Sequence, residues 1–160
     1  MDDTLTTLFS HNLWANLALL ELCSELTDEQ LDSTLDGTYG SIRDTLVHIA
    51  RGERSYMSRI STGQPYTGGN SGLDSLAQIR ESLQTTGEAF IEWAPKVTAD
   101  ETVVVDWDGT LRNVPKTILL TQAINHATEH RAQIMTILTQ LGFQPAELSG
   151  WEYFDAMDVE

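Results

Sequence analysis

Two histidines four residues apart, His126 and His130, are the residues of this chain best suited to metal chemistry. They stand in NHATEHRAQI, a segment with helical periodicity. Side chains at this spacing share a helix face, with Cβ atoms about 6 Å apart, so two imidazoles can converge on one ion. At about 100° per residue, His130 lies about 40° and His126 about 80° from the apolar direction of the helix. We therefore expect both rings on the flank that faces the core.

The pair lacks the glutamate of the metalloprotease motif HExxH. In that motif the glutamate directly follows the first histidine and acts as a general base. Here Ala127 occupies that position, and Glu129 lies about 140° from the core direction. A metalloprotease is therefore not expected. Two structural histidines at the edge of the core remain the alternative to a metal site.

A third histidine, His48, stands in TLVHIARGE, in the middle of another helical segment. It lies near the edge of that segment's apolar stripe, from where it can face the helix of His126 and His130; a surface histidine is the alternative. Three neutral imidazoles suit Zn²⁺, Ni²⁺, Fe²⁺ or Co²⁺, and they leave at least one coordination position for water or substrate. Such a site would be catalytic rather than structural. The fourth histidine, His11, is expected at the surface or behind the ligands.

Other polar residues fall on apolar stripes. Glu53 lies near the middle of such a stripe, where a carboxylate needs a partner. It is a candidate catalytic base or orienting group; alternatively, it is a buried hydrogen-bond partner of Asn12, Asn16 or Trp14. The two asparagines are expected to bridge helices or to contact substrate. Trp14 is expected to pack or to form a pocket wall.

Four helical segments must position these side chains. Apolar periodicity predicts helices over residues 4–26, from the N-cap Ser41 to the loop at 62–72, over 73–96, and from Pro115 to Leu141, with Gly142 at the C-cap. TVVVDWDGTLRNV alternates around the turn signal Asp108-Gly109 and predicts a hairpin. Four amphipathic helices can bury their apolar faces only against one another. The sequence therefore predicts an all-α four-helix bundle with a small β-hairpin before the last long helix, as a single domain over 1–160.

Composition excludes several classes of protein. The net charge of −15, with only two lysines, opposes approach to a phosphate backbone, so we expect no nucleic-acid partner. No apolar run approaches the roughly 20 residues of a membrane span, and the acidic N-terminus lacks the basic start of a secretory signal. We expect a cytoplasmic protein. The single cysteine, Cys23, cannot form an intramolecular disulfide and is expected to be a small core residue.

Three segments in this order, LWANLALLELCSEL, GSIRDTLVHIARGERSYMSRI and INHATEHRAQIMTILTQLGFQP, carry a resemblance to a known family. The chain resembles the DinB family of four-helix proteins, within the DinB/YfiT-like metalloenzyme superfamily, from about Leu8 to Phe154. The resemblance implies a divalent metal held by His48, His126 and His130. Zinc or nickel is expected first, with iron, cobalt or manganese as alternatives, and the resemblance also implies a homodimer.

The resemblance also favours one reaction class. Characterised relatives include transferases and isomerases that use low-molecular-weight thiols, and metal ligation turns a thiol into a nucleophilic thiolate. We therefore expect a thiol S-transferase that acts on small electrophilic or stress-related molecules. One alternative is a hydrolase that uses a metal-bound water. Another is a non-catalytic, metal-stabilised dimer that senses or binds a ligand.

Overall fold

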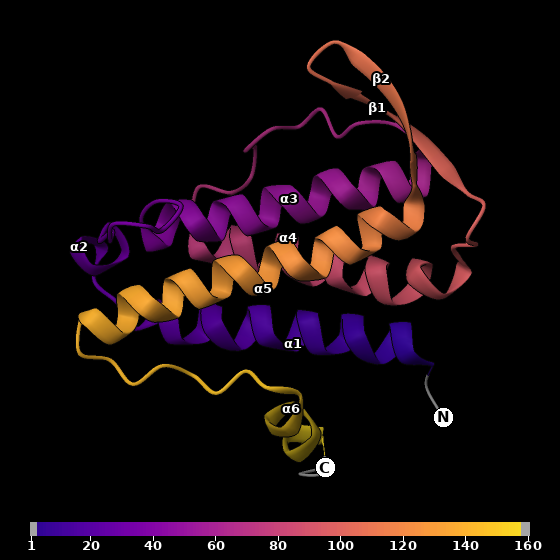
Figure 1. The fold of residues 1–160 in the computed structure, drawn as a ribbon. Coiled ribbons are helices and arrows are strands. Elements are labelled where there is room, and N and C mark those ends of the chain that lie inside the picture. The colour runs from indigo at the N-terminus through magenta and orange to yellow at the C-terminus, as the bar shows by residue number, and fades with distance from the viewer. Residues whose placement is uncertain (1–2, 158–160) are drawn as a thin grey trace.

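The computed structural model describes residues 3–157 and shows a helical bundle with one hairpin (Figure 1). None of its helices combines the length and the apolar character that a bilayer span needs. The elements in chain order are α1 (Thr4–Ser24), α2 (Asp28–Leu31), α3 (Ile42–Thr62), α4 (Leu76–Trp93), the 3-10 turn η1 (Ala94–Lys96), β1 (Thr102–Trp107), β2 (Thr110–Pro115), α5 (Lys116–Gln140) and α6 (Gly150–Met157).

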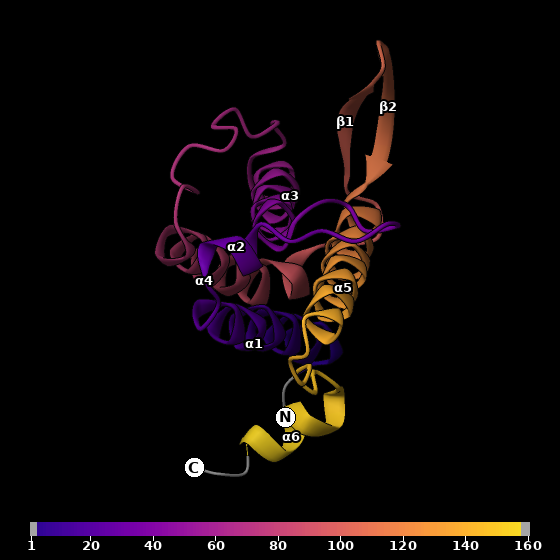
Figure 2. The ribbon, with the colours of Figure 1, turned by 90° about the vertical axis from the view of Figure 1, so that its left-hand side faces the viewer.

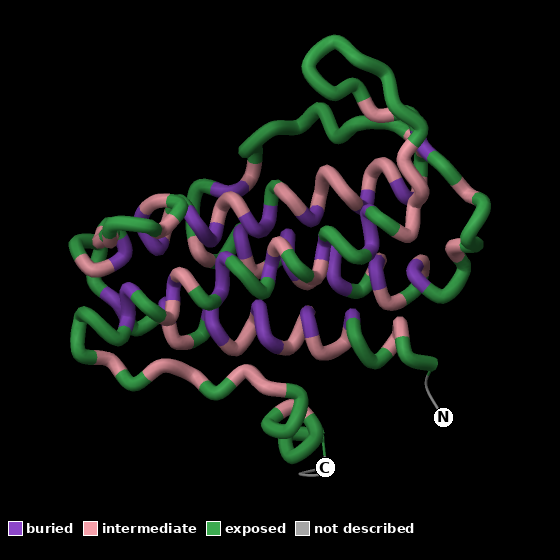
Figure 3. The backbone as a smooth tube through the Cα atoms, in the orientation of Figure 1, coloured by how far each residue is buried: buried purple, intermediate pink, exposed green. Residues whose placement is uncertain are grey.

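The four long helices form the predicted bundle. Figure 2 shows α1 and α3 at opposite corners, with α4 and α5 between them on either side. Both α1 and α3 pack against α4 and α5. The helices turn their buried residues inward, whereas the hairpin and α6 are largely exposed (Figure 3). The all-α bundle with a hairpin before the last long helix is thus confirmed.

Local sequence signals set the helix ends. Ser41 caps α3 in a capping box with Asp44, as predicted. The start of α4 lies three residues later than expected, because the side chain of Ser75 accepts a hydrogen bond from the Gln78 N–H and caps the helix. Pro115 is the residue before α5 rather than its first residue. Gly142 follows the helix with a φ of +86°, the left-handed conformation that terminates helices.

A long crossover determines the direction of α4. The loop between α3 and α4 runs back along the outside of the bundle, so these two helices point the same way (Figure 1). A segment of 13 residues can span about 43 Å, more than the roughly 31 Å length of a 21-residue helix such as α3. Figure 1 also shows α5 antiparallel to α3. Figure 2 shows this crossover outside α3, on the side of α4 rather than on that of α5.

The hairpin forms around the predicted turn. Asp106 pairs with Leu111 and Trp107 with Thr110, and the residues between them, Asp108 and Gly109, have φ values of 50° and 83°. Positive φ at both central residues is the requirement of a type I′ turn. The hairpin extends beyond the bundle at the N-terminal end of α5 (Figures 1 and 2).

The core is divided by a polar layer. One apolar cluster contains Leu19, Leu46 and Ile134, and a second contains Phe9, Met57 and Phe90. On α1, α3 and α4, buried polar side chains lie between the two clusters along the chain, and on α5 a buried arginine lies near the same level; we call these residues the polar layer: Asn12, Asn16, Glu53, Thr86 and Arg131. At the edges of the bundle, Leu8 on α1 is 42% exposed, and α6 contains no buried residue.

Candidate metal centre

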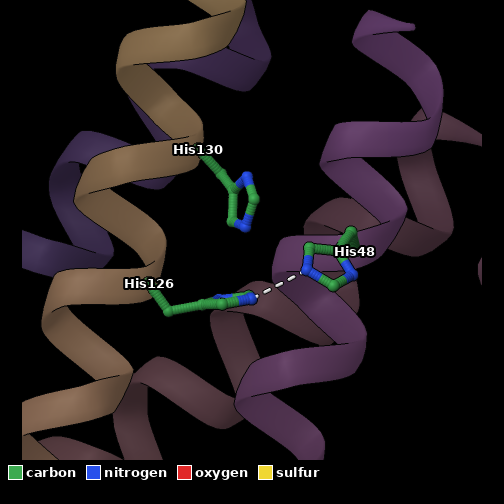
Figure 4. A group of neighbouring side chains, drawn as sticks. All are labelled: His48, His126 and His130. Carbon is green, nitrogen blue, oxygen red and sulfur yellow. Dashed lines mark hydrogen bonds between the residues drawn. The ribbon is translucent and has the colours of Figure 1, made fainter. Parts of the chain in front are cut away.

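Three histidines from two antiparallel helices meet at one point. His48 on α3 and His126 and His130 on α5 each offer a ring nitrogen, and these nitrogens lie within 4.8 Å of one another (Figure 4). His130 is buried, and the other two are partly buried. The helical spacing that placed His126 and His130 on the core-facing flank is thereby confirmed, and His48 faces them. We call these three residues the histidine triad.

The ring nitrogens of the triad fit a shared cation. The Nε2 atoms of His48 and His126 lie 2.9 Å apart. Two nitrogens bound about 2.0–2.1 Å from one ion are separated by about 2.9 Å at right-angle coordination and about 3.4 Å in a tetrahedron. The buried Nδ1 atoms of the same two rings have no hydrogen-bond partner among the described residues. The Nε2 atoms of the two rings face each other, and both Nδ1 atoms are left without a hydrogen bond in the described part of the chain. The hydrogen-bonding capacity of the two rings is thus poorly met there, and their Nε2 lone pairs are suited to a metal.

The orientation of His130 is fixed by Gln133. The side-chain oxygen of Gln133 accepts a hydrogen bond from the backbone N–H of Tyr39 and lies 3.0 Å from Nδ1 of His130. Because this oxygen is an acceptor, Nδ1 of His130 must carry the proton. The Nε2 lone pair is therefore free for a metal, and a ligand histidine held through its other nitrogen in this way is typical of metal sites.

Electrostatics keep two of the imidazoles neutral. Burial lowers the pKa of His126 to about 4, and the charges of His130, His48 and Arg51 act in the same direction. Burial, together with the charges of His130 and Arg51, also lowers the pKa of His48. A metal requires the neutral ring, so both side chains are in the form that binds a cation at neutral pH.

Gly52 and two tyrosines surround the triad closely. A Cβ on Gly52 would lie 2.7 Å from Cε1 of His126, so only glycine leaves room for this ring. Tyr39 stacks on His48 with ring centroids 3.9 Å apart, and Tyr56 meets His126 edge-on at 5.7 Å. The rotamers of the ligand rings are thus restricted from several sides, as a preorganised site requires.

A pocket of about 290 Å³ opens beside the triad. We call it the triad pocket. Its walls come from α3 and from the crossover loop, and its lining includes His48, Arg51, Ser55, Tyr56, Tyr66 and His126. A second opening, of about 440 Å³, reaches only His48 of the triad. Pockets for small molecules have volumes that start at about 300 Å³, so the triad pocket suits a small substrate beside a metal.

Glu53 lies in the polar layer. One oxygen accepts hydrogen bonds from the side-chain amides of Asn12 (2.9 Å) and Asn16 (2.8 Å), and the other accepts from the hydroxyl of Thr86 (2.7 Å). Burial raises the pKa of this carboxyl, whereas the three donors and the charge of Arg131 oppose the shift. These contacts match the predicted structural role as a partner of Asn12 and Asn16. They leave neither oxygen directed at the triad.

Trp14 and His11 lie against the C-terminal tail. The Trp14 ring packs on Tyr153 of α6, with centroids 5.5 Å apart, and Nε2 of His11 lies 2.9 Å from the carbonyl oxygen of Leu148. Among the described residues, the lining of the triad pocket includes neither Trp14 nor His11. It includes no residue of the hairpin either. The sequence reasoning missed Tyr39, Gly52 and Gln133. Gly52 had one available signal, its place four residues after His48 on the same face of α3.

Comparisons with known proteins give a family match and two similar folds. The family model of the DinB family matches residues 1–157. A crystal structure of a DinB-like protein from Bacillus cereus is similar, with 20% identity, 86% of this chain and 91% of that chain covered, and a TM-score of 0.62. A DinB-like protein from Bacillus subtilis, YjoA, shows 16% identity, coverage of 88% and 95%, and a TM-score of 0.60.

At these identities the two structures show a shared fold alone. No protein with a curated description matches the chain. The family model, in contrast, spans nearly the whole sequence and includes all three histidines. The chain belongs to the DinB family.

Proposed function

We propose that this protein is a divalent-metal-dependent transferase that joins a low-molecular-weight thiol to a small electrophile. The observation that carries the proposal is the triad itself: three ring nitrogens within 4.8 Å of one another at the edge of a small pocket. Three protein ligands are the number that leaves room for a reactant. Zinc or nickel is the metal expected first, because imidazole ligands suit both.

The residues around the triad have separable tasks. His48, His126 and His130 would hold the ion, and Gln133 holds His130 in the tautomer that presents Nε2. A bound divalent ion supplies Lewis-acid activation, which lowers the pKa of a thiol. Tyr56 and Tyr66 offer aromatic surface to the electrophile within the pocket. A third tyrosine, Tyr39, stacks on the ring of His48.

The proposed reaction is a nucleophilic substitution, which needs no reagent other than the thiol and the electrophile. The thiol loses its proton to solvent, the sulfur forms a bond to the electrophilic carbon, and the leaving group departs with the bonding electron pair. None of the described residues that line the triad pocket is a carboxylate. Glu53, the predicted catalytic base, has both oxygens engaged in the polar layer. We therefore assign the proton to solvent rather than to Glu53.

The test combines metal analysis with a substrate panel. Plasma mass spectrometry of the purified protein, of His126→Ala and of the matched control His11→Ala should show metal lost only in His126→Ala. Aryl halides and epoxides are then incubated with and without thiol. Conjugation that needs both thiol and His126 supports the proposal. Conjugation that persists in metal-free protein refutes it, turnover without thiol indicates a hydrolase, and metal-dependent stabilisation without turnover indicates a binding module.

We also propose that the protein is a homodimer, and an uncharged surface supports this. From Thr4 to Leu20, α1 contains no Asp, Glu, Lys or Arg, although the chain has 33 such residues in total. A groove of about 310 Å³ between α1 and α5 is lined by uncharged residues, among them Leu5, Leu8 and Ile124. Two copies that each carry −15 repel one another, so they can approach most easily across a charge-free surface.

The partner for this surface is a second copy of the chain. We expect sedimentation equilibrium to give twice the mass of 17.8 kDa. Leu8→Glu places a charge at the groove and should yield monomers, whereas Leu111→Glu, on the exposed hairpin, should leave the mass unchanged. A monomeric wild-type protein, or a Leu8→Glu dimer, would show that the surface serves another purpose.

A further inference from the structure

Arg51 is the one cationic side chain in the described residues that has no partner. The chain contains nine lysines and arginines. Arg112 lies over the ring of Trp107, and the others form hydrogen bonds or ion pairs, as in the pairs Arg43–Asp28, Arg54–Ser82, Arg59–Ser55, Arg80–Glu21, Lys96–Glu92, Lys116–Glu101 and Arg131–Asn16. Arg51 differs from the other arginines in that neither a carboxylate, a neutral acceptor nor an aromatic ring among the described residues engages its guanidinium.

The position of Arg51 places it at the triad. It lies three residues after His48 on α3, and residues at this spacing share a helix face. It is exposed and lines both the triad pocket and the second opening beside His48. No Asp or Glu occurs among the described residues that line the triad pocket. Arg51 is thus the one charged side chain among the described residues that line the triad pocket, whereas Asp44 and Asp74 line the second opening.

We propose that Arg51 is a specificity residue that selects small substrates bearing a carboxylate, by binding that anion while the reactive end of the substrate lies at the triad. A guanidinium presents paired donors that match the two oxygens of a carboxylate. Tyr56 and Tyr66 line the same pocket and offer apolar surface to the rest of such a substrate. This role rests on the proposed function. It adds that the thiol or the electrophile used by the transferase carries a negatively charged carboxylate.

Three probes of similar size separate the carboxylate from the thiol: 3-mercaptopropionate, which has both groups, 2-mercaptoethanol, which is a neutral thiol, and propionate, which has only the carboxylate. Binding to the cobalt-loaded protein is followed by the thiolate-to-cobalt absorption band, and by calorimetry for propionate. We expect 3-mercaptopropionate to bind about tenfold more tightly than 2-mercaptoethanol, the size of one exposed, charge-assisted contact.

The variants assign this preference to one side chain. Arg51→Gln should remove the tenfold preference while leaving 2-mercaptoethanol affinity and cobalt binding unchanged. Arg51→Lys should restore part of it, because the charge remains but the paired donors do not. Arg112→Gln removes an equal charge from the hairpin and should change nothing. A second readout needs no metal: phenylglyoxal should modify Arg51 first among the arginines, with protection by propionate but not by 2-mercaptoethanol.

The outcomes distinguish this inference from the proposed function. Equal affinity for the two thiols, or an unchanged preference in Arg51→Gln, overturns the role of Arg51 and leaves the thiol transferase intact. Propionate that binds and protects Arg51 in a protein that binds neither thiol at the metal supports the anion contact and overturns thiol chemistry.

Discussion

A single methyl group added to α3 at Gly52 is predicted to weaken metal binding strongly while the bundle stays intact. A Cβ at this position would lie 2.7 Å from Cε1 and 3.1 Å from Nδ1 of His126. Non-bonded carbon atoms are at their optimum about 3.5–4.0 Å apart, so the ring must move by about 0.8–1.3 Å. Metal–nitrogen distances vary by only about 0.2 Å. The Gly52→Ala protein should therefore lose His126 as a ligand.

The expected loss of affinity is large and does not come from unfolding. Removal of a group that only orients a ligand already costs about 10–100-fold in metal affinity. We therefore expect Gly52→Ala to bind zinc at least about 100-fold more weakly, close to His126→Ala. Glycine within a helix is less favourable than alanine by about 0.5–1 kcal/mol. The free energy of unfolding of the metal-free protein should accordingly stay level or rise.

The matched control is the same substitution on another helix. A Cβ at Gly87 on α4 would meet Leu13 Cδ1 at 2.6 Å. Overpacking of this kind costs about 1–3 kcal/mol, so Gly87→Ala should lower stability and leave zinc affinity unchanged. Competition with a chromophoric chelator measures affinity, and urea denaturation of metal-free protein measures stability. The assignment of His126 as a ligand that depends on Gly52 is refuted if Gly52→Ala binds zinc like the wild type, because His126 would then not need the space at Gly52. It is also refuted if Gly52→Ala loses as much stability as Gly87→Ala.

Two further substitutions and one measurement of thiol reactivity test the triad's support, the polar layer and the core. Gln133→Ala removes the acceptor at Nδ1 of His130, and chelator competition should show zinc affinity reduced about 10–100-fold; unchanged affinity would contradict its orienting role. Glu53→Gln leaves the buried guanidinium of Arg131 without its counter-charge, so urea denaturation should show a loss of about 3 kcal/mol; a loss under about 1 kcal/mol would argue against this role. Burial raises the pKa of Cys23 to about 12, so at pH 8 the native thiol should react with an aromatic disulfide about 10³-fold more slowly than the denatured thiol; comparable rates would count against a buried thiol.

The helices and the shared face of His126 and His130 could be predicted because both follow from short-range spacing. The capping box at Ser41 and the Asp108-Gly109 turn depend on a few neighbouring residues, and the structure contains both. The pair His126 and His130 is an i, i+4 pattern, so its shared face follows from helix geometry alone. Glu53 was recognised as buried because it interrupts an apolar stripe.

The remainder of the site depends on contacts between distant parts of the chain. Tyr39 meets His48 and Gln133 only because the segment before α3 folds back across the bundle. Tyr66 reaches the triad pocket on the crossover loop, whose path along the bundle has no periodic signature. Gly52 is required by the ring of His126, which comes from another helix. Sequence spacing within one element carries no information on such pairs.

The polar layer connects the spacing of residues within each helix to the contacts between helices. Arg131 donates to the side-chain oxygens of both Asn12 (2.8 Å) and Asn16 (2.6 Å), so both amide nitrogens must point toward Glu53. This fixes α1, α3 and α5 in one rotational setting, because turning any of the helices leaves a charge buried without a partner. Arg131 directly follows His130, and Glu53 follows Gly52. The rotation that satisfies the buried charges is therefore also the rotation that brings the rings of α3 and α5 together.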